Sequence, residues 1–330
     1  GSGETVTQAM QRLRGTGRYE YVEPDHIVHG HVQPNDPYFP SAQWSLNNTG
    51  SNGPGGGTAG ADIGALSAWS SATVANSASN IIVAVVDSGA LLAHEDLAPN
   101  LWSGGGGQHG VSYVSGNGTQ TDTNPNDTEV GHGSHVSGII GAAGNNSAGI
   151  SGIAWSVKLM ELRFLHGTSG SGSVSDAIAC VNYAVANGAK VINASFGSDS
   201  YSNSEYDSIK AARDAGVIFV ASAGNDTANV DVGAAFPAGY DLDNIVTVAA
   251  TTNTDALASY SNFGAGAVDL AAPGSSIYSC GYTATNSYIT ESGTSMAAPH
   301  VTGVLALMRA KFPSDTYRQL INRLLRSVTP

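Results

Sequence analysis

The chain has 330 residues, of which 41% are hydrophobic and 12% are charged, so it can bury a sizeable core in one large domain or two modest ones. Its 13 basic and 26 acidic residues give a formal net charge of -13 without a local basic patch, and we therefore expect no binding to nucleic acid or to an anionic membrane surface. No apolar run reaches the roughly 18 residues that a membrane-spanning helix needs.

Composition also indicates the compartment. A low lysine content with much Gly, Ser, Thr and Asn is typical of a secreted enzyme. The chain starts with Gly1-Ser2-Gly3 and lacks an apolar signal region, so we expect that any export signal has been removed. Cys180 and Cys280 allow either one internal disulfide or two free buried thiols, and the sequence favours neither.

The N-terminal part of the chain differs in texture from the rest. It carries several arginines, and the mixed polar pattern of residues 19–25 predicts the end of a helix followed by a strand. The sequence Pro34-Asn35-Asp36-Pro37 then interrupts regular structure. We therefore predict a short segment at residues 1–32 and one main domain at residues 33–330.

Beyond a glycine-rich loop at residues 49–60, short β-branched runs alternate with alanine-rich segments of helical length. The runs are almost unbroken in their apolar character, as in strands that are buried on both faces of a parallel sheet. Five strands are predicted in this way, at residues 81–86, 157–162, 191–194, 217–221 and 245–249. The sequence therefore predicts a doubly wound α/β fold with helices on both faces of the sheet.

The segments between these strands predict helices and loops. Helices are expected at residues 174–187 and 206–215, because a glycine closes each of these periodic segments. Surface loops are expected at residues 103–110 and 117–129, which are rich in Gly or in Asn, Asp and Thr. A nucleotide-binding loop would also use glycine, but neither Gly-x-x-x-x-Gly-Lys nor a Gly-x-Gly-x-x-Gly after the first strand occurs.

Polar residues follow two of the predicted strands, where open α/β sheets bind their ligands. Asp87 comes directly after the strand at residues 81–86, and Asn225 comes shortly after the strand at residues 217–221. Taken alone, Asp87 before a Ser-Gly pair is typical of a turn, and Asn225 is typical of a loop. Their shared position at strand ends makes both candidates for chemistry.

His132 and His135 lie between the first two strands, in a segment of small residues that leads into a predicted helix at residues 139–143. Two histidines three positions apart would suit a metal ion, but no third ligand has a suitable spacing. Small residues around a histidine are equally typical of tight packing. With Asp87 before it and a serine later in the chain, His132 also suits an acid–base role.

The segment Gly293-Thr294-Ser295-Met296-Ala297-Ala298-Pro299 precedes an apolar run at residues 301–308, which predicts a helix buried on all sides. A serine in the first turn of such a helix lies beside unpaired backbone N–H groups and at the positive end of the helix dipole, which suits a nucleophile. Pro299 is expected in that first turn, where proline is tolerated. A Thr-Ser pair in this position is nevertheless more often an N-cap.

Taken together, three segments carry a resemblance. Asp87-Ser88-Gly89, His132-Gly133-Ser134-His135-Val136 and the segment from Gly293 to Pro299 resemble, in this order, the three signature boxes of the subtilisin-like serine proteases, the subtilases. The likeness covers roughly residues 33–325 and implies a three-layer fold, with a mostly parallel sheet of about seven strands and helices on both faces. The sequence departs from the family at Ser134, where Thr is usual, and at Ser137, where Ala is usual.

The resemblance implies a serine endopeptidase with Asp87, His132 and Ser295 as its triad. His132 would accept the proton of Ser295 as the hydroxyl attacks the scissile carbonyl to form an acyl-enzyme, and would then give it to the leaving amine. Asp87 would hold the imidazole in the required tautomer. The side chain of Asn225 and the backbone N–H of Ser295 would stabilise the negative charge that develops on the carbonyl oxygen.

By the same resemblance, a protein or peptide substrate binds as an added β-strand. Small residues leave the slot for the residue before the cut bond open, so we expect broad specificity with a preference for a large apolar side chain there, and Asp226 would also admit a basic one. The residues expected to line this cleft are Gly170, Ser171, Gly172, Val174, Ser195, Phe196, Gly197, Ser222, Ala223, Gly224 and Ala235.

The resemblance also implies calcium as a structural cofactor and no cofactor for catalysis. Residues 34–38 are similar to the start of the thermitase branch of the family. A hard cation takes carboxylate, amide and carbonyl oxygens together. The ligands expected on this basis are the carboxylates of Asp36 and Asp96, the amide oxygen of Asn146, and the carbonyls of Gly144, Ala148 and Ile150.

The N-terminal segment acquires two interpretations from the resemblance. Residues 21–25 resemble the tail of the family's inhibitory propeptide, which would occupy the cleft of the zymogen until it is cut. Residues 1–32 would equally suit a retained N-terminal extension. The partners expected are therefore protein or peptide substrates and the chain's own propeptide, as inhibitor and chaperone, with the protein a monomer.

Two rival functions, each from a different class of protein, are also considered. A protein can keep a protease fold without activity and serve as a binding protein, although the presence of Asp87, His132, Ser295 and Asn225 argues against this. Another serine hydrolase, such as an esterase, would carry a Gly-x-Ser-x-Gly motif and a different order of triad residues, and this sequence has neither.

Overall fold

The structure is a computed structural model and describes residues 4–24, 32–69, 72–233 and 235–329. The chain divides into two units, Gly1–His31 and Val32–Pro330. In the first unit, α1 (Val6–Gly15) begins with a capping box in which the side chains of Thr5 and Gln8 bond each other's backbone N–H groups, and none of its residues is buried.

The strand predicted at residues 19–25 is not formed in the part that the structure describes. Residues 19–24 have no strand geometry, and Asp25 lies outside the described residues. The physical reason is that a strand needs a partner, because a single extended segment leaves its backbone groups unpaired. The sequence pattern alone contains no information about that partner.

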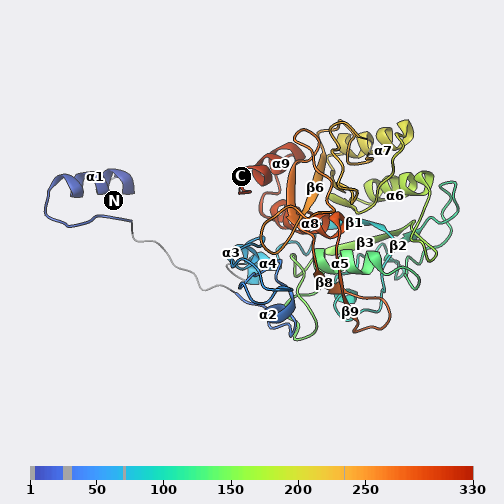
Figure 1. The fold of residues 1–330 in the computed structure, drawn as a ribbon, viewed down its shortest axis with the longest axis horizontal. Coiled ribbons are helices and arrows are strands. Elements are labelled where there is room, and N and C mark those ends of the chain that lie inside the picture. Colours follow the sequence, from blue (N-terminus) through green and yellow to red (C-terminus); the bar gives the residue numbers. More distant parts are fainter. Residues whose placement is uncertain (1–3, 25–31, 70–71, 234, 330) are drawn as a thin grey trace. The chain divides into compact units, whose positions relative to one another are not determined.

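Within the described residues of the second unit, seven strands form one sheet in the order β2-β3-β1-β4-β5-β6-β7. Figure 1 labels β1, β2, β3 and β6 of this sheet. All neighbouring strands in it are parallel. The strands are β1 (Ile82–Asp87), β2 (Gly110–Ser112), β3 (Lys158–Arg163), β4 (Val191–Ala194), β5 (Ile218–Ser222), β6 (Ile245–Thr251) and β7 (Leu270–Pro273). The five predicted strands and the α/β fold are thus confirmed.

Strands β2 and β7 are not predicted by the sequence pattern because they are short edge strands. Gly110, assigned above to a surface loop, is in fact the first residue of β2 and pairs with Glu161 of β3. It has a positive φ of 149°, and a Cβ atom there would collide with the carbonyl oxygen of Glu161. Glycine at this position therefore permits strand pairing, which its frequency in loops concealed.

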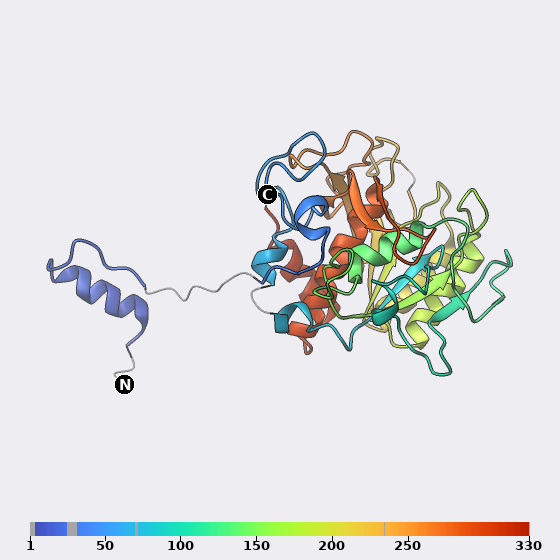
Figure 2. The same cartoon turned by 90° about the horizontal axis from the view of Figure 1, so that it is seen from below.

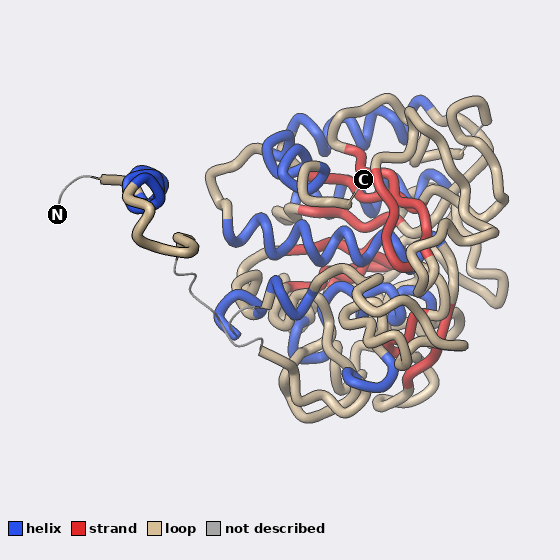
Figure 3. Tube along the Cα trace, turned by 60° about the vertical axis from the view of Figure 1, so that its left-hand side comes forward, coloured by secondary structure: helices blue, strands red, loops and turns tan. Residues whose placement is uncertain are grey.

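Helices cover both faces of the sheet because successive strand residues point in opposite directions (Figures 2 and 3). Val83 and Val85 of β1 belong to a core cluster with α5 (His132–Gly141), α8 (Thr294–Lys311) and α9 (Tyr317–Leu325). Ala84 and Val86 belong to the cluster on the other face, with α6 (Val174–Ala186) and α7 (Asn203–Asp214). This alternation gives the predicted three-layer architecture.

The remaining elements are short. Four of them are the single turns α2 (Phe39–Ala42), α3 (Ala65–Ala68), α4 (Ala72–Ala75) and η1 (Ala98–Asn100). The strands β8 (Ile277–Cys280) and β9 (Tyr288–Glu291) form an antiparallel hairpin beside α5. In the described part of the chain, no helix combines the length and the apolar character that crossing a bilayer would require.

The predicted helices form, with shifted ends. Helix α7 begins three residues earlier than expected because Ser202 caps it, its hydroxyl accepting the backbone N–H of Glu205 at 3.2 Å. Helix α5 begins at His132 rather than at residue 139. Its first turns contain glycines that disfavour an isolated helix, so packing against the sheet and the β8–β9 hairpin has to stabilise it.

Pro299 does not lie in the first turn of α8, as expected above, but is its sixth residue. Proline has no N–H, so the carbonyl oxygen of Ser295, four residues earlier, lacks the usual helical donor. The hydroxyl of Ser195 donates to that carbonyl instead, at 2.9 Å. The proline therefore opens a position in the helix backbone through which α8 is bonded to the segment after β4.

The two cysteines are free and buried, which decides between the two alternatives left open by the sequence. Cys180 belongs to the core cluster with α6, and Cys280 belongs to the cluster with α5 and α8. The sheet separates these clusters, so a disulfide between the two thiols is not compatible with this fold.

Candidate active site

The candidate residues meet where the strand order reverses. Strand β1 has β3 on one side and β4 on the other. Asp87 is the last residue of β1, His132 is the first residue of α5, and Ser295 is the second residue of α8. The carboxyl ends of parallel strands on both sides of such a reversal leave a crevice, which is the usual ligand site of this architecture.

Asp87 and His132 form a close pair. Nδ1 of His132 lies 2.8 Å from Oδ1 and 2.9 Å from Oδ2 of Asp87, whose carboxyl is completely buried. The backbone N–H of Ser88 donates a further hydrogen bond to Oδ1 at 2.7 Å. Because a carboxylate can only accept, Nδ1 carries the proton, and Nε2 of the neutral imidazole is left as a proton acceptor.

The charge of Asp87 controls the basicity of His132. Burial on its own would lower the pKa of His132, but the negative charge of Asp87 and its hydrogen bond outweigh burial and raise the pKa to about 9. Glu291 and Asp127 contribute smaller effects in the same direction. His132 therefore has a fixed orientation and a high affinity for a proton, and its Nε2 accepts one from Ser295 in the neutral form of the imidazole.

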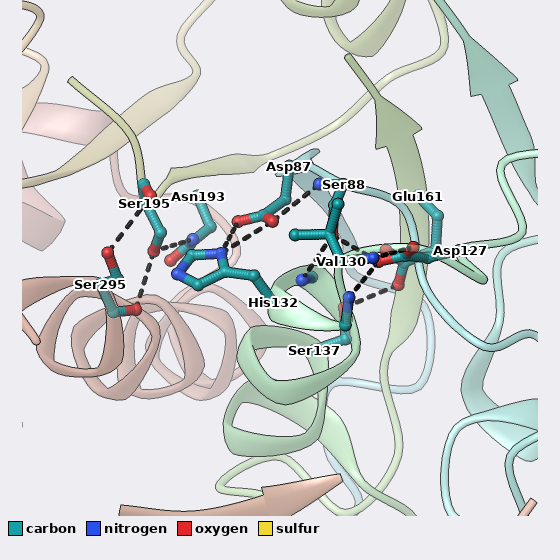
Figure 4. A network of polar contacts seen from close by, with 12 residues as sticks. Asp87, Ser88, Asp127, Val130, His132, Ser137, Glu161, Asn193, Ser195 and Ser295 are labelled. Carbon is teal, nitrogen blue, oxygen red and sulfur yellow. Dashed lines mark hydrogen bonds and ion pairs between the residues drawn. The ribbon is translucent and has the colours of Figure 1, made fainter. Parts of the chain in front are cut away.

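Ser295 lies on the other side of the imidazole ring from Asp87 (Figure 4). Its hydroxyl donates to the carbonyl oxygen of Ser195 at 3.3 Å, and no hydrogen bond to His132 is formed among the described residues. Contacts between a nucleophile and its base are often loose in a free enzyme and tighten when substrate binds. Proton transfer to His132 therefore requires the Ser295 hydroxyl to turn away from Ser195.

A short series of side chains fixes the start of α8 to β4. Asn193 of β4 donates from Nδ2 to the hydroxyl of Ser195 at 2.9 Å, and this hydroxyl donates to the Ser295 carbonyl (Figure 4). Thr302, two helical turns further along α8, donates to Oδ1 of Asn193 at 2.8 Å. Because these side chains are buried, the series positions Ser295 against the sheet.

Asn225 is held so that its amide nitrogen stays free. Its Oδ1 accepts the backbone N–H of Thr294 at 2.9 Å and the hydroxyl of Thr294 at 3.0 Å. These contacts fix which atom is oxygen, and Nδ2 donates to no described residue. The backbone N–H of Ser295, in the first turn of α8, has no partner within its helix either. Nδ2 of Asn225 and this N–H are the two donors available beside Ser295.

A buried acidic group lies behind the Asp87–His132 pair. Asp127, in the segment predicted to be a surface loop, is completely buried and accepts the hydroxyl of Ser88 at 2.6 Å. It also accepts the N–H of Gly131 at 2.7 Å, and Ser88 accepts the N–H of Gly133 at 2.9 Å. The segment is a loop and mostly exposed, as predicted, but Asp127 is buried in it because its carboxylate provides acceptors for backbone N–H groups that would otherwise be buried without partners.

A second buried carboxyl, Glu161 of β3, was not identified from the sequence. Its Oε1 accepts the hydroxyl of Ser137 at 2.8 Å, and its Oε2 is buried with no hydrogen-bond partner. Burial raises the pKa of Glu161 to about 8, and the charges of Asp87 and Asp127 act in the same direction. The available signal was a single Glu within a nearly apolar strand, together with the departure from the family pattern at Ser137.

A cleft of about 660 Å³ extends from His132 along the site. Seven of the residues predicted to bind substrate line it, namely Gly170, Ser171, Gly172, Val174, Ser195, Phe196 and Gly197. Four are not among its lining residues, namely Ser222, Ala223, Gly224 and Ala235. Ala223 is completely buried, and Gly224 donates its N–H to the hydroxyl of Thr294 at 3.1 Å, which places this segment beside the start of α8.

The residues predicted to bind calcium converge on the loop at residues 144–150. Asp36 and Asp96 are 1% and 0% exposed, and burial raises the pKa of both carboxyls. Asp36 accepts the N–H of Asn145 at 2.7 Å, while Asp96 accepts the side chain of Asn146 at 2.8 Å and the N–H of Ile150 at 2.9 Å. The described residues include no group of three or more His, Cys, Asp or Glu side chains suited to a metal.

Comparisons with known proteins give a consistent result. The model of the subtilase family matches residues 78–329. An extracellular protease of Xanthomonas campestris is 34% identical to the chain, and the alignment covers 96% of this chain but only 56% of that protein. Subtilisin Savinase of Lederbergia lenta is 39% identical, with 76% of this chain and 84% of the relative covered.

Solved structures give the same fold. A protease structure from Pseudoalteromonas arctica matches with a TM-score of 0.77 and 28% identity, covering 91% of this chain and 93% of that chain. The crystal structure of a cold-adapted subtilisin-like serine proteinase matches with a TM-score of 0.66 and 30% identity, covering 87% of this chain and 91% of that chain.

The buried Glu161 predicts a pH-dependent stability. A carboxyl whose pKa is raised on folding, from 4.5 to about 8, contributes stability that is complete at low pH and is lost as the pH rises through this window. In a Ser295→Ala background, we therefore expect Glu161→Gln to match its parent near pH 5 and to be more stable by on the order of 2 kcal/mol at about pH 9. Denaturant unfolding at both pH values measures this difference. An equal effect of the substitution at both pH values would contradict a titrating Glu161.

Proposed function

This chain belongs to the subtilase family, and we propose that it is a secreted serine endopeptidase that cuts protein substrates with Asp87, His132 and Ser295. The observation that carries this proposal is the buried Asp87–His132 pair, with Nδ1 and Oδ1 at 2.8 Å, on one side of an imidazole that has Ser295 on its other side. The names of the relatives, among them an extracellular protease, support the same function and compartment.

In the proposed mechanism, His132 removes the proton of Ser295 while the hydroxyl oxygen attacks the scissile carbonyl carbon. The amine leaves with the proton that His132 then donates, and an acyl-enzyme on Ser295 remains. A water molecule, deprotonated by His132, hydrolyses this ester and restores the enzyme. Asp87 keeps the proton on Nδ1 and stabilises the imidazolium that forms in each half of the reaction.

The negative charge on the attacked carbonyl oxygen is stabilised by Nδ2 of Asn225 and the backbone N–H of Ser295. Both donors are fixed before substrate arrives, because Thr294 holds Oδ1 of Asn225 and the helix holds the N–H of Ser295. The positive end of the α8 dipole adds to this stabilisation. The peptide itself binds as an added strand between residues 170–174 and 195–197, with a large apolar side chain preferred before the cut bond.

We also propose that Ca2+ binds at Asp36 and Asp96. These carboxyls are buried and have no Lys or Arg partner among the described residues. Burial raises the pKa of both, and the charge of Asp96 adds to the rise at Asp36. A cation would offset this cost. With two carboxylates available, the remaining ligands are the amide of Asn146 and the carbonyls of Gly144, Ala148 and Ile150, which suits a hard ion that accepts neutral oxygens. The amide of Asn146 would have to turn its oxygen toward the ion.

The N-terminal unit is proposed to be the end of an inhibitory propeptide or a retained extension. Its helix α1 contributes no buried residue, and Tyr21, within the segment that resembles the propeptide tail, is 76% exposed.

The first prediction concerns the nucleophile. We expect Ser295→Ala to reduce hydrolysis of a denatured protein substrate to the background rate without changing the thermal midpoint by more than about 2 °C, since only one partly buried hydroxyl is removed. Ser292→Ala is a matched control three residues earlier, and it should retain activity. Unimpaired hydrolysis by Ser295→Ala would rule out the proposed triad.

The second prediction concerns the oxyanion. Replacing Asn225 with Ala removes a donor that acts only once charge has developed, so we expect kcat to fall by on the order of 100–1,000-fold with KM nearly unchanged. Steady-state kinetics with a chromogenic peptide separate the two constants. A rise in KM at constant kcat would instead place Asn225 in ground-state binding.

The third prediction concerns calcium. In the Ser295→Ala protein, which cannot digest itself, we expect removal of Ca2+ with excess chelator to lower the thermal midpoint by about 5–10 °C, because a ligand bound only by the folded state stabilises it. The Asp96→Asn variant should have a lowered thermal midpoint even without chelator, and adding chelator should change that midpoint little. If the chelator leaves the midpoint of the parent unchanged, no calcium site contributes to its stability.

A further inference from the structure

The cleft beyond the proposed triad contains a carboxyl group that the mechanism does not use. Glu205 lies in the first turn of α7, is 4% exposed and lines the cleft. Its Oε2 accepts the hydroxyl of Tyr240 at 2.8 Å, and its Oε1 has no hydrogen-bond partner among the described residues. This oxygen is not among the described side-chain atoms that are buried without a partner, so it is open to the cleft and available to a ligand.

A cluster of aromatic rings lies beside this carboxyl and contacts it through Tyr240. Phe236 lines the cleft, and its ring centroid is 4.8 Å from that of Tyr240, whose hydroxyl bonds Glu205. Tyr201 stands edge-on to both rings, with centroid distances of 5.1 Å and 5.0 Å. Aromatic faces beside a carboxylate attract cations and also provide apolar contact for a methylene chain.

The charges around Glu205 in the cleft are mostly negative. Asp199 is a second carboxyl among the lining residues, and His132 is the one basic side chain among those described there. No Lys or Arg therefore neutralises Glu205 from within the cleft, in a chain whose formal net charge is -13. The potential in this part of the cleft favours a cation.

The position of Glu205 along a bound peptide follows from the protein segment that would pair with it. The carbonyl of Ser195 lies 3.3 Å from the hydroxyl of Ser295, so this residue is level with the cut bond. Ser198, three residues further, exchanges two backbone hydrogen bonds with Phe236 at 2.8 Å and 2.9 Å. Three residues of extended chain advance about 10 Å. A peptide strand alongside therefore brings its third or fourth residue before the cut bond to Phe236 and Glu205.

We propose that this part of the cleft is a binding site for a basic side chain, Lys or Arg, carried by the third or fourth residue before the cut bond. The ammonium or guanidinium group would pair with Oε1 of Glu205, its charge would lie against the rings of Phe236 and Tyr240, and the methylene stem would cover Phe196. The inference rests on the proposed proteolytic function. Substrate specificity would then have two determinants: an apolar side chain next to the cut bond, and a basic side chain at the third or fourth residue before it.

The test uses a series of peptides that share one cleavable bond and carry Lys, Arg, Leu or Glu at each of the second to fifth positions before it. We expect Lys or Arg at the third or fourth position to raise kcat/KM roughly tenfold over Leu, a value typical of a partly desolvated charge-assisted contact. In Glu205→Gln, the ratio of kcat/KM for the Lys and Leu peptides should fall to about one, while Glu205→Asp should keep part of the preference.

Asp207→Asn is the matched control, because it removes the same charge from an exposed position of α7 and should leave the Lys-to-Leu ratio as it is in the parent. Thermal midpoints of all variants show whether each is folded. A parent without preference for a basic residue, or a preference that survives in Glu205→Gln, would overturn the inference. Failure of the parent to cleave any peptide would instead refute the proposed function itself.

Discussion

The buried charge of Asp87 is the constraint on which the rest of the site depends. A carboxylate at the end of a central strand is tolerated only if donors surround it, and here they are Nδ1 of His132 and the N–H of Ser88. The donor from His132 requires α5 to begin directly beside β1. Gly133 makes that approach feasible, because a Cβ atom there would collide with the carbonyl oxygen of Gly89. The hydrogen bond from His132 to Asp87 and the close packing at Gly133 therefore both require α5 to begin at this position.

The start of α8 is positioned by an independent set of contacts. Pro299 leaves the Ser295 carbonyl without a helical donor, and the Ser195 hydroxyl supplies one from the end of β4. Proline would disturb an ordinary helix, but here it leaves a carbonyl free for the hydrogen bond that holds Ser295 beside the sheet. Because α5 and α8 are fixed to the neighbouring strands β1 and β4, where the strand order reverses, the imidazole and the serine lie on the same side of the crevice.

Buried carboxyls recur around this site and have different consequences. Asp127 has backbone and hydroxyl donors and organises the segment before α5. Glu161 has one hydroxyl donor and one oxygen without a partner, so its burial keeps it protonated up to about pH 8. Glu205 also has a free oxygen, but it faces the cleft rather than the core. The donors around each carboxyl, and whether its free oxygen lies in the core or faces the cleft, decide whether it serves structure, limits stability or attracts a ligand.

The sequence by itself determined the α/β class, the five central strands and, through three short motifs in order, the family. Apolar runs are set by burial on both faces, and motif residues are set by chemistry, so both are visible without coordinates. Tertiary structure alone decided the features that depend on a partner distant in the chain. Residues 19–24 form no strand, and Asp127 is buried in what resembled a surface loop. The Ser295 carbonyl, which Pro299 leaves without a helical donor, accepts the hydroxyl of Ser195 directly after β4. Hydrogen-bond satisfaction is a property of neighbours in space, and a linear pattern does not record which neighbours will supply it.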